Sequence, residues 1–582
     1  MPPLTESPPS SLRRWLAPVL CALAGLGWGV YLVGPTPLLP GSLDWMLQED
    51  WAAPLLGWLY SRTSPWSLPL GDARGFVHPL GSSLAFTDAT PWWGSLFKLL
   101  SPLLPAAFQI HGPWLALCFT LQGLFGALVV SRLTSRPVSQ VLGGLLFVMS
   151  PALALRLGHP SLCAHWVVLA LFWLHLRPSP DAHAASRTLR LAALVIVLAA
   201  GFHVYLAAMA LVLAFALLWR VRGVLSGARA GAWAAGLCGG ALGVMALFGY
   251  FTRATTSAVG FNQYSANLLT FFNPSGMSRV LPELPTGANQ YEGAAYLGLG
   301  VLVLGLAVLG VLRAKREVYG PLLPPGMKPL LVACGLLALF AFSARLQVAG
   351  WTVLSVQRAT EPVLAPLGRV FRSSGRFIWP LHYLCILGAV AGLLRVLRER
   401  PAWATAALGL AVVLQATEVP ARECCRARFE AHVQAAPGGD ATWALAAGTY
   451  QHLALYPAKR EDGAGRGCAG LFSNAGILPY AWQAWRNGMT FNSGYVARLD
   501  EPSTLAACRG EQEALQAGRL EPDTVYVVHA RVAARFLEHT AGRAVCGSLD
   551  GVLVCVSNAS RGPFREVLER HAALPDVARD TR

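Results

Sequence analysis

Three carboxylates follow the first long apolar segment of the chain, residues 15–34, where they could do acid-base chemistry. Asp44, Glu49 and Asp50 lie in the sequence DWMLQEDWAAPLLGW. A carboxylate at the mouth of a membrane can stay ionised while it faces a polar cleft, which suits a general base that removes a proton from a hydroxyl. Asp50 is the first candidate for this base and Asp44 the second. Asp88, farther along the same stretch, is a candidate substrate-binding residue and the next base candidate after these two.

Three arginines surround a Ser-Ser-Gly sequence in RVFRSSGRFIWP, at Arg369, Arg372 and Arg376. Guanidinium groups match the oxygens of a phosphate or pyrophosphate, so we predict that these arginines clamp such a group. Contact with lipid headgroups is the alternative. A phosphate that arginines neutralise can leave without a general acid, and a carboxylate across the cleft could remove the proton of the incoming group.

Two further polar segments are predicted to bind substrate. RLGHPSLCAHW contains His159 and His165, and PTGANQYEGAAYLGLG contains Tyr291 and Glu292. The two histidines could also be satisfied residues at the membrane interface, or could hold a divalent cation together with Asp50, although their spacing alone is weak evidence for a metal. No cofactor is predicted, and the metal is left unassigned. The chain has no Walker loop, GxGxxG, GxSxG or HExxH motif, so nucleotide-binding and hydrolase chemistry of those kinds is unsupported.

The composition indicates a membrane protein with a globular C-terminal part. Of 582 residues, 54% are hydrophobic and 13% are charged, against about 25% charged in soluble proteins. Residues 1–419 hold 41 of the charged residues, about one in ten, whereas residues 420–582 hold 35, about one in five. The net charge of +16 comes almost entirely from the first block, where it is a topology signal and not a nucleic-acid footprint.

Eleven apolar segments are predicted to cross the membrane. They are residues 15–34, 111–131, 138–155, 163–176, 189–203, 204–219, 232–251, 294–312, 329–344, 376–394 and 401–417. With the N-terminus in the cytoplasm, the cytoplasmic loops hold 17 Lys and Arg against four acids, as expected for such loops. An odd number of spans then places the C-terminal domain in the periplasm. We interpret the run after Arg14 as an uncleaved first span and not as a signal peptide, because no small-residue cleavage pattern follows it.

The expected fold is therefore an α-helical polytopic membrane domain over residues 1–419 with a long first outer loop, 35–110, followed by a small extracytoplasmic α/β domain. That domain covers 420–565, and 566–582 is expected to be a flexible tail. TVYVVHA and GVLVCVSN are typical of strands, 440–456 and 510–518 of helices, and GMTFNSGYVAR of a loop. The first outer loop also holds six tryptophans, which we expect in an interfacial aromatic belt, unless one or two of them stack on a sugar or line an entry groove for a lipid tail. They are Trp45, Trp51, Trp58, Trp66, Trp92 and Trp93.

Six cysteines lie in the predicted outer domain, where an oxidising compartment favours disulfides. Cys546 and Cys555 bracket a short predicted hairpin, so we predict that they pair. Cys468 with Cys508 could close a longer loop, although spacing alone does not fix the connectivity.

The motifs resemble a known family. DWMLQEDWAAPLLGW, PLGSSLAFTDATP, GHPSLCAHW, QYEGAAYLGLG and FRSSGRFIWP resemble the bacterial DUF6311 family of membrane proteins, which is similar to the GT-C superfamily of polyprenyl-phosphate-dependent glycosyltransferases. The resemblance covers about residues 15–560. It implies a multi-span glycosyltransferase in which a first-loop acid activates the acceptor, and the matching positions are Asp50 and then Asp44. The superfamily's usual Gln-His pair after that acid is replaced here by Trp51-Ala52-Ala53-Pro54.

Three functions follow as hypotheses. The first is an inverting glycosyltransferase of the bacterial inner membrane, which moves a sugar from a polyprenyl-phosphate donor in the bilayer to an unknown lipid, glycan or protein acceptor at the outer face. The second is a transporter of a lipid-linked substrate, and the third is a non-catalytic scaffold of the same fold. Transporters commonly show internal repeats and polar groups at mid-membrane depth. This chain shows no repeat and gathers its polar residues at one face, which favours the enzyme.

Overall fold

The computed structural model describes residues 11–252, 254–319, 326–430 and 435–571. These residues fall into two units. Unit 1 comprises the described residues of 1–39, 112–244 and 259–429, and unit 2 those of 40–111, 245–258 and 430–582. Most of the predicted first outer loop therefore shares a unit with the C-terminal residues.

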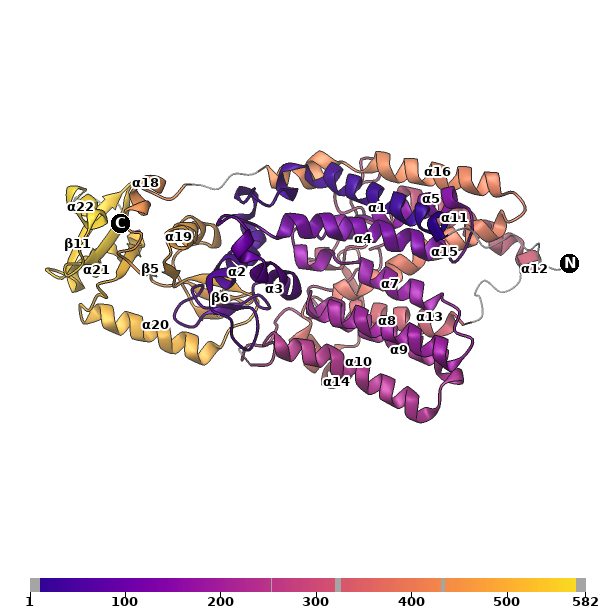
Figure 1. Ribbon diagram of the computed structural model, residues 1–582, viewed down its shortest axis with the longest axis horizontal. Helices are drawn as coiled ribbons and strands as arrows, with labels where there is room; N and C mark the ends of the chain where they lie inside the picture. The colour runs from indigo at the N-terminus through magenta and orange to yellow at the C-terminus, as the bar shows by residue number, and fades with distance from the viewer. Residues whose placement is uncertain (1–10, 253, 320–325, 431–434, 572–582) are drawn as a thin grey trace. The chain divides into compact units, whose positions relative to one another are not determined.

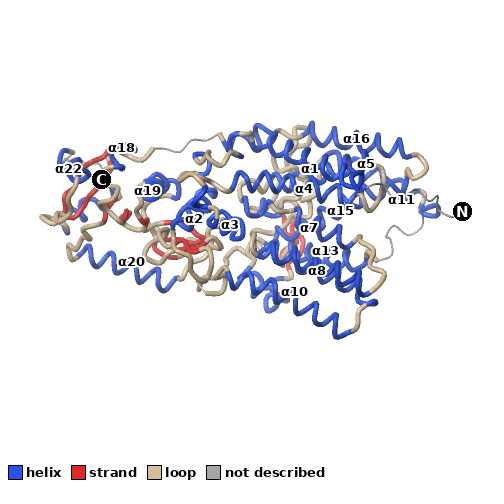
Figure 2. The backbone as a smooth tube through the Cα atoms, in the orientation of Figure 1, coloured by secondary structure: helices blue, strands red, loops and turns tan. Residues whose placement is uncertain are grey.

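Unit 1 is built from apolar helices (Figures 1 and 2). Each of the eleven predicted spans contains one: α1 (Ser11–Val33), α4 (His111–Val130), α5 (Pro137–Val148), α7 (Trp166–His175), α8 (Ala182–Ala200), α9 (Val204–Val221), α10 (Gly227–Leu247), α11 (Leu299–Ala314), α13 (Lys328–Ala341), α15 (Trp379–Val396) and α16 (Pro401–Glu418). Within the described ranges, six helices are long and apolar enough to cross a membrane, or seven if α16 and the bent segment after it form one span. Four more apolar helices are 10–17 residues long. The chain is a membrane protein, and the count of eleven spans stays a prediction.

Shorter elements connect these helices. They are α6 (Pro151–Ala154), the turn η7 (Gln290–Gly293), α12 (Arg316–Tyr319), the antiparallel hairpin β3 (Arg345–Val348) and β4 (Trp351–Ser355), α14 (Gln357–Val370), the turn η8 (Ser374–Ile378) and α17 (Ala427–Phe429). The turns η7 and η8 pack against each other. They carry two of the polar motifs singled out in the sequence.

Glycines allow α1 and α4 to approach at backbone distance. A Cβ added at Gly25 would lie 2.3 Å from the carbonyl oxygen of Phe119, and one added at Gly123 would lie 2.1 Å from that of Cys21. Small residues at such contacts are typical of helix pairs in membranes, where association depends on close packing. The α1 and α4 contact therefore requires glycine at both positions.

Replacing Gly25 with Leu is expected to destabilise unit 1 by about 1–3 kcal/mol or more, because the obstructing atom is backbone and cannot rotate away. Thermal unfolding of the detergent-solubilised chain measures the effect. Gly27→Leu in the same helix is the matched control, since nothing lies within 4 Å of a Cβ added there. Equal unfolding midpoints for the two variants would contradict this helix contact.

Unit 2 contains a five-stranded sheet in the order β11-β12-β10-β5-β8. Its strands are β5 (His452–Tyr456), β8 (Thr490–Phe491), β10 (Thr524–Val528), β11 (Ala544–Leu549) and β12 (Val552–Ser557). β10 pairs parallel with β5, and β5 with β8, whereas β12 runs antiparallel to both β10 and β11. A smaller sheet has the order β7-β6-β9, from β6 (Arg460–Asp462), β7 (Gly467–Cys468) and β9 (Gly494–Val496).

The central strand of the larger sheet, β10, is buried on both sides because helices cover both faces of the sheet. In β10, Val525 and Val527 enter one hydrophobic cluster, and Tyr526 and Val528 enter another, as the period of two in a strand requires. The helices of unit 2 are α2 (Ala52–Thr63), α3 (Pro91–Leu99), α18 (Gly439–Ala444), α19 (Asn474–Arg486), α20 (Glu501–Gln516), α21 (Ala533–His539) and α22 (Pro563–Arg570). The two-residue strands β1 (Asp72–Ala73) and β2 (Ser82–Ser83) pair antiparallel.

The segment 40–111 supplies part of this core. Phe76 forms a parallel bridge with Phe491, and the backbone N–H of His78 donates to the Phe491 oxygen at 2.9 Å. Tyr60 stacks on Phe76, and both rings belong to the cluster that also contains Val525 and Val527. Chain segments about 400 residues apart thus fold around one core.

Several local predictions for the C-terminal part need correction. Residues 440–456 are not one helix, because α18 ends at Ala444 and β5 begins at His452. GMTFNSGYVAR is not a loop, since it forms β8 and β9. The predicted tail begins inside α22, which runs to Arg570, and residues 572–582 lie outside the described residues. The strands predicted at TVYVVHA and GVLVCVSN are present as β10 and β12.

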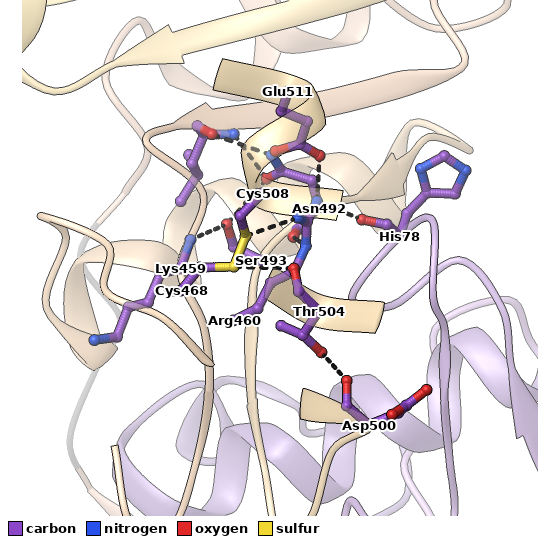
Figure 3. The surroundings of a disulfide bond; sticks show 11 residues. His78, Lys459, Arg460, Cys468, Asn492, Ser493, Asp500, Thr504, Cys508 and Glu511 are labelled. Atoms are coloured by element: carbon purple, nitrogen blue, oxygen red, sulfur yellow. Dashed lines mark hydrogen bonds and ion pairs between the residues drawn. A yellow bond between two sulfur atoms is a disulfide. The ribbon is translucent and has the colours of Figure 1, made fainter. Parts of the chain in front are cut away.

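Disulfides join both cysteine pairs that the sequence suggests, Cys468 with Cys508 and Cys546 with Cys555. The first ties β7 to α20 (Figure 3). The adjacent residues Cys424 and Cys425 are also bonded, which the sequence analysis does not anticipate.

Candidate functional site

A buried cluster of three charged side chains lies in unit 1. Arg156 follows α6, Glu292 belongs to η7 and Arg376 belongs to η8. Arg376 donates from Nε and Nη2 to the two oxygens of Glu292, at 3.0 and 2.6 Å. Arg156 donates from Nη1 to Glu292 Oε2 at 2.5 Å and from Nη2 to the Tyr291 carbonyl at 2.9 Å. Two of the predicted site residues, Glu292 and Arg376, are therefore brought together, with Arg156 as a third partner.

The cluster carries one excess positive charge in a protected place. The exposed fractions of Arg156, Glu292 and Arg376 are 4, 3 and 7%. Burial by itself would raise the pKa of Glu292, but the two guanidinium groups outweigh it and hold that pKa well below its usual range. Glu292 is therefore ionised at neutral pH and pairs with both arginines. The three side chains sum to a formal charge of +1, and two guanidinium groups held together favour an anion beside the cluster.

The turns that carry the cluster meet at two glycines. A Cβ at Gly375 would lie 2.7 Å from the Cα of Gly293, so the backbones of η8 and η7 are in direct contact. The N–H of Gly375 donates to the carbonyl of Tyr264 at 2.9 Å, which fixes η8 from a third segment. The close contact of Gly375 with Gly293 therefore allows their charged neighbours in the sequence, Arg376 and Glu292, to meet.

Aromatic rings surround the arginines. Arg376 lies over Tyr205, with 4.8 Å between its Cζ and the ring centroid, and the Tyr205 hydroxyl accepts from the backbone N–H of Ser373 at 2.9 Å. Arg372 is half-buried and lies over the ring of Tyr264 at 5.2 Å. Arg369, near the end of α14, is exposed. The three predicted phosphate-binding arginines thus differ in environment from the packed interior to the surface.

The two predicted histidines have different environments. His165 is fully buried, with Nδ1 2.8 Å from the Tyr383 hydroxyl and its ring 4.2 Å from that of Trp379. His159 is half-buried and close enough to contribute to the lowered pKa of Glu292. Tyr291, whose carbonyl accepts from Arg156, exposes 56% of its surface. The described residues contain no group of three or more His, Cys, Asp or Glu that could hold a metal ion.

The predicted carboxylate bases belong to unit 2. Asp44 begins a 3-10 turn, Asp44–Met46, and Asp50 lies in the next one, Glu49–Trp51; both are exposed. Asp88 is half-buried with a φ of +61°, a left-handed conformation that Asp tolerates better than most residues. These acids therefore belong to a different unit from the arginine cluster.

Both predictions for the loop tryptophans are wrong for Trp45, Trp51 and Trp58, which are buried in unit 2. Trp45 and Trp51 contact each other edge to face, and the Trp58 indole donates to the Phe108 carbonyl at 2.7 Å. These rings cannot form a lipid-facing belt or stack on a sugar, because protein covers them. Trp66 remains 54% exposed and lies under the Lys98 ammonium.

The sequence does not single out Arg460, and it marks Arg156 only as one polar residue of the motif that also holds His159 and His165. Arg460 is fully buried in unit 2, where it donates to the carbonyls of Asn492 and His78 and pairs with Glu511. Arg156 stands in the same polar motif as His159, so its membrane-flanking position was the available signal. Arg460 lies in an ordinary charged stretch and had no such signal.

The domain of unknown function DUF6311 matches residues 22–420, and the DUF6311 C-terminal domain matches residues 442–557. No curated protein sequence matches the chain. Among solved structures, the arabinofuranosyltransferase AftD from mycobacteria aligns with 15% identity and a TM-score of 0.46, over 94% of this chain and 40% of that one. A mutant form of AftD aligns with 16% identity and a TM-score of 0.46, over 95% and 42%. The chain spans about two fifths of the length of these structures.

Proposed function

This chain belongs to the DUF6311 family, and we propose that it is an inverting membrane glycosyltransferase, which moves a sugar from a polyprenyl-phosphate donor to a lipid, glycan or protein acceptor. The observation that carries the proposal is the buried cluster of Arg156, Glu292 and Arg376, whose excess positive charge would attract the donor phosphate. The resemblance of its motifs to GT-C enzymes supports a sugar as the transferred group. We place the protein in the bacterial inner membrane, with the transfer at the outer face.

The arginines take different roles in this proposal. Because Nε and Nη2 of Arg376 already donate to Glu292, Arg376 contributes its charge and fixes η8. Arg372 and Arg369, which are more accessible, make the direct contacts with the phosphate. Tyr264 orients Arg372 by lying beneath its guanidinium group.

The transfer itself needs one proton acceptor and one leaving group. The acceptor oxygen forms a bond to the anomeric carbon, and the bond between that carbon and the phosphate oxygen breaks. The leaving phosphate takes the bonding electrons, and the arginines stabilise its charge. Asp50 removes the proton from the acceptor hydroxyl.

Replacing Arg372 with Ala is expected to weaken the binding of a polyprenyl monophosphate about 10- to 100-fold, because a charge-assisted hydrogen bond is lost. Binding to the full chain in detergent measures this, with the phosphate-free polyprenol as a ligand control. Arg358→Ala is the matched protein control. Arg358 is an exposed arginine near the start of α14, the helix that ends just before Arg372.

The outcome separates this proposal from its alternatives. Equal binding by Arg372→Ala and Arg358→Ala would contradict the phosphate assignment, as would equal affinity for polyprenol and its phosphate. Phosphate binding without any sugar transfer would favour the scaffold or the transporter.

A further inference from the structure

Unit 2 contains a hollow that the proposed function does not use. Its volume is about 270 Å³, and its walls come from residues 77–86, Thr252 and residues 496–504. All of these residues belong to one unit. The hollow is slightly smaller than the roughly 300–1,000 Å³ that encloses a drug-sized ligand, so it suits one ring-sized group.

Backbone hydrogen bonds hold the walls together. The N–H of Ala497 donates to the Phe86 carbonyl at 2.7 Å, which joins two of the lining segments. The carbonyl of Leu499 accepts from the N–H groups of Thr255 and Thr256, at 3.1 and 3.2 Å, which joins the third. The cavity is therefore built into the fold before any ligand binds, and preorganisation lowers the cost of binding.

Two further links fix the hollow from outside (Figure 3). The disulfide between Cys468 and Cys508 ties α20, whose first turn lines the hollow, to β7. The buried guanidinium of Arg460 donates to the carbonyl of His78 at 2.8 Å, and His78 adjoins the lining residue Val77 in the chain. Figure 3 shows the disulfide and His78 on either side of Thr504, whose hydroxyl donates to the Asp500 carbonyl at 2.7 Å.

The lining combines balanced charge with hydroxyl and apolar groups. Arg498 supplies N–H donors and Asp500 supplies carboxylate acceptors, so their charges cancel. Ser503 donates to the Asp500 carboxylate, and Ser82 and Thr252 add further hydroxyls. Phe86 and four aliphatic side chains form the apolar part. A neutral ligand with hydroxyls at its edge and C–H groups on its faces matches this lining, and a sugar ring has that character.

We propose that this hollow binds one sugar residue of a neutral glycan. The inference deepens the proposed function, on which it rests, because the bound glycan would be the acceptor or would extend from it. Arg498 and Asp500 hold the ring hydroxyls, and the apolar side chains at the rim, such as the half-buried Leu80, contact C–H groups of the ring. A charged glycan is disfavoured because the lining residues that the structure describes carry one positive and one negative charge, Arg498 and Asp500.

The test screens the full chain in detergent against an immobilised array of neutral and uronate-containing oligosaccharides. We expect at least one neutral oligosaccharide to bind. Arg498→Ala removes the donor, and Thr252→Phe fills the hollow from an exposed position, so each should weaken that binding about tenfold or more. Arg519→Ala, an exposed arginine of the same unit outside the hollow, is the matched control and should bind unchanged.

The results distinguish the sugar site from the proposed transferase. Binding of no neutral oligosaccharide, binding of uronates alone, or unchanged affinity in both hollow variants would overturn the proposal. Arg372→Ala should keep glycan binding while it loses the polyprenyl phosphate. Failure of the donor assay together with intact glycan binding would therefore reject the transferase and leave the sugar site standing.

Discussion

Replacing Asp50 with Asn is expected to lower sugar transfer on the order of 100-fold or more, with little change in the binding of the polyprenyl-phosphate donor. The amide keeps the size of the side chain and much of its hydrogen bonding but cannot accept the acceptor's proton. A loss confined to turnover indicates an interaction made in the transition state. Transfer is measured in proteoliposomes with a polyprenyl-phosphate sugar, and binding is measured separately with the polyprenyl phosphate.

The control for Asp50 is Glu521→Gln, which converts an exposed carboxylate of the same unit into an amide. Normal transfer by that variant shows that loss of one negative charge is not enough to stop the reaction. If Asp50→Asn transfers sugar at a near-normal rate, Asp50 is not the base. Asp44→Asn and then Asp88→Asn would follow, in the order that the sequence predicts.

The helices of unit 1 could be located from sequence because each signal is local. A segment in the membrane must satisfy its backbone internally, so a long apolar run becomes a helix. The predicted span 401–417 is α16, Pro401–Glu418, and 15–34 lies close to α1, Ser11–Val33. Boundaries fail where a helix begins with polar residues, as α8 does at Ala182, seven residues before the predicted start.

The partnership of segment 40–111 with the C-terminal residues could not be predicted in the same way. Its evidence is the bridge between Phe76 and Phe491 and the hydrogen bond from Arg460 to the His78 carbonyl. Neither contact leaves a periodic pattern in the sequence, because the partners are about 400 residues apart. The abundant tryptophans suggested a membrane interface, yet the burial of Trp45 and Trp58 accounts for two of them.

The candidate site was predictable in its motifs and not in its pairing. Glu292 and Arg376 were both identifiable as polar residues beside apolar spans, but the sequence could not show that each is the other's partner. The sequence alone assigns Arg376 to phosphate binding, whereas in the structure it donates to Glu292. The contact between Gly293 and Gly375 supplies the missing geometry, since it brings the two turns to backbone distance.

Replacing Glu292 with Gln is expected to destabilise unit 1 by about 3–5 kcal/mol, because two buried guanidinium groups lose their counterion. The amide has nearly the same shape, so packing changes little. Thermal unfolding of the solubilised chain should show a midpoint lower by on the order of 5 °C or more. Glu283→Gln is the control, because Glu283 is an exposed carboxylate of the same connecting segment.

A double variant separates charge from shape. Glu292→Gln combined with Arg156→Gln restores the net charge of the cluster to its original excess of one, and it should recover part of the lost stability. A double variant no more stable than Glu292→Gln would show that the hydrogen-bond geometry, and not the charge balance, stabilises the turns.

The pH dependence gives a third readout of Glu292. Its pKa in the folded protein is lowered, so its ionised form adds stability above the ordinary Glu pKa of about 4.3. That contribution is lost as the pH falls below about 4.3 toward the lower folded value. The stability difference between the unaltered chain and Glu292→Gln should therefore be largest near pH 7 and should shrink as the pH is lowered from 4.3 toward 3. A difference that stays constant over this range would mean that Glu292 does not titrate with a lowered pKa, and the arginines would then need another counterion.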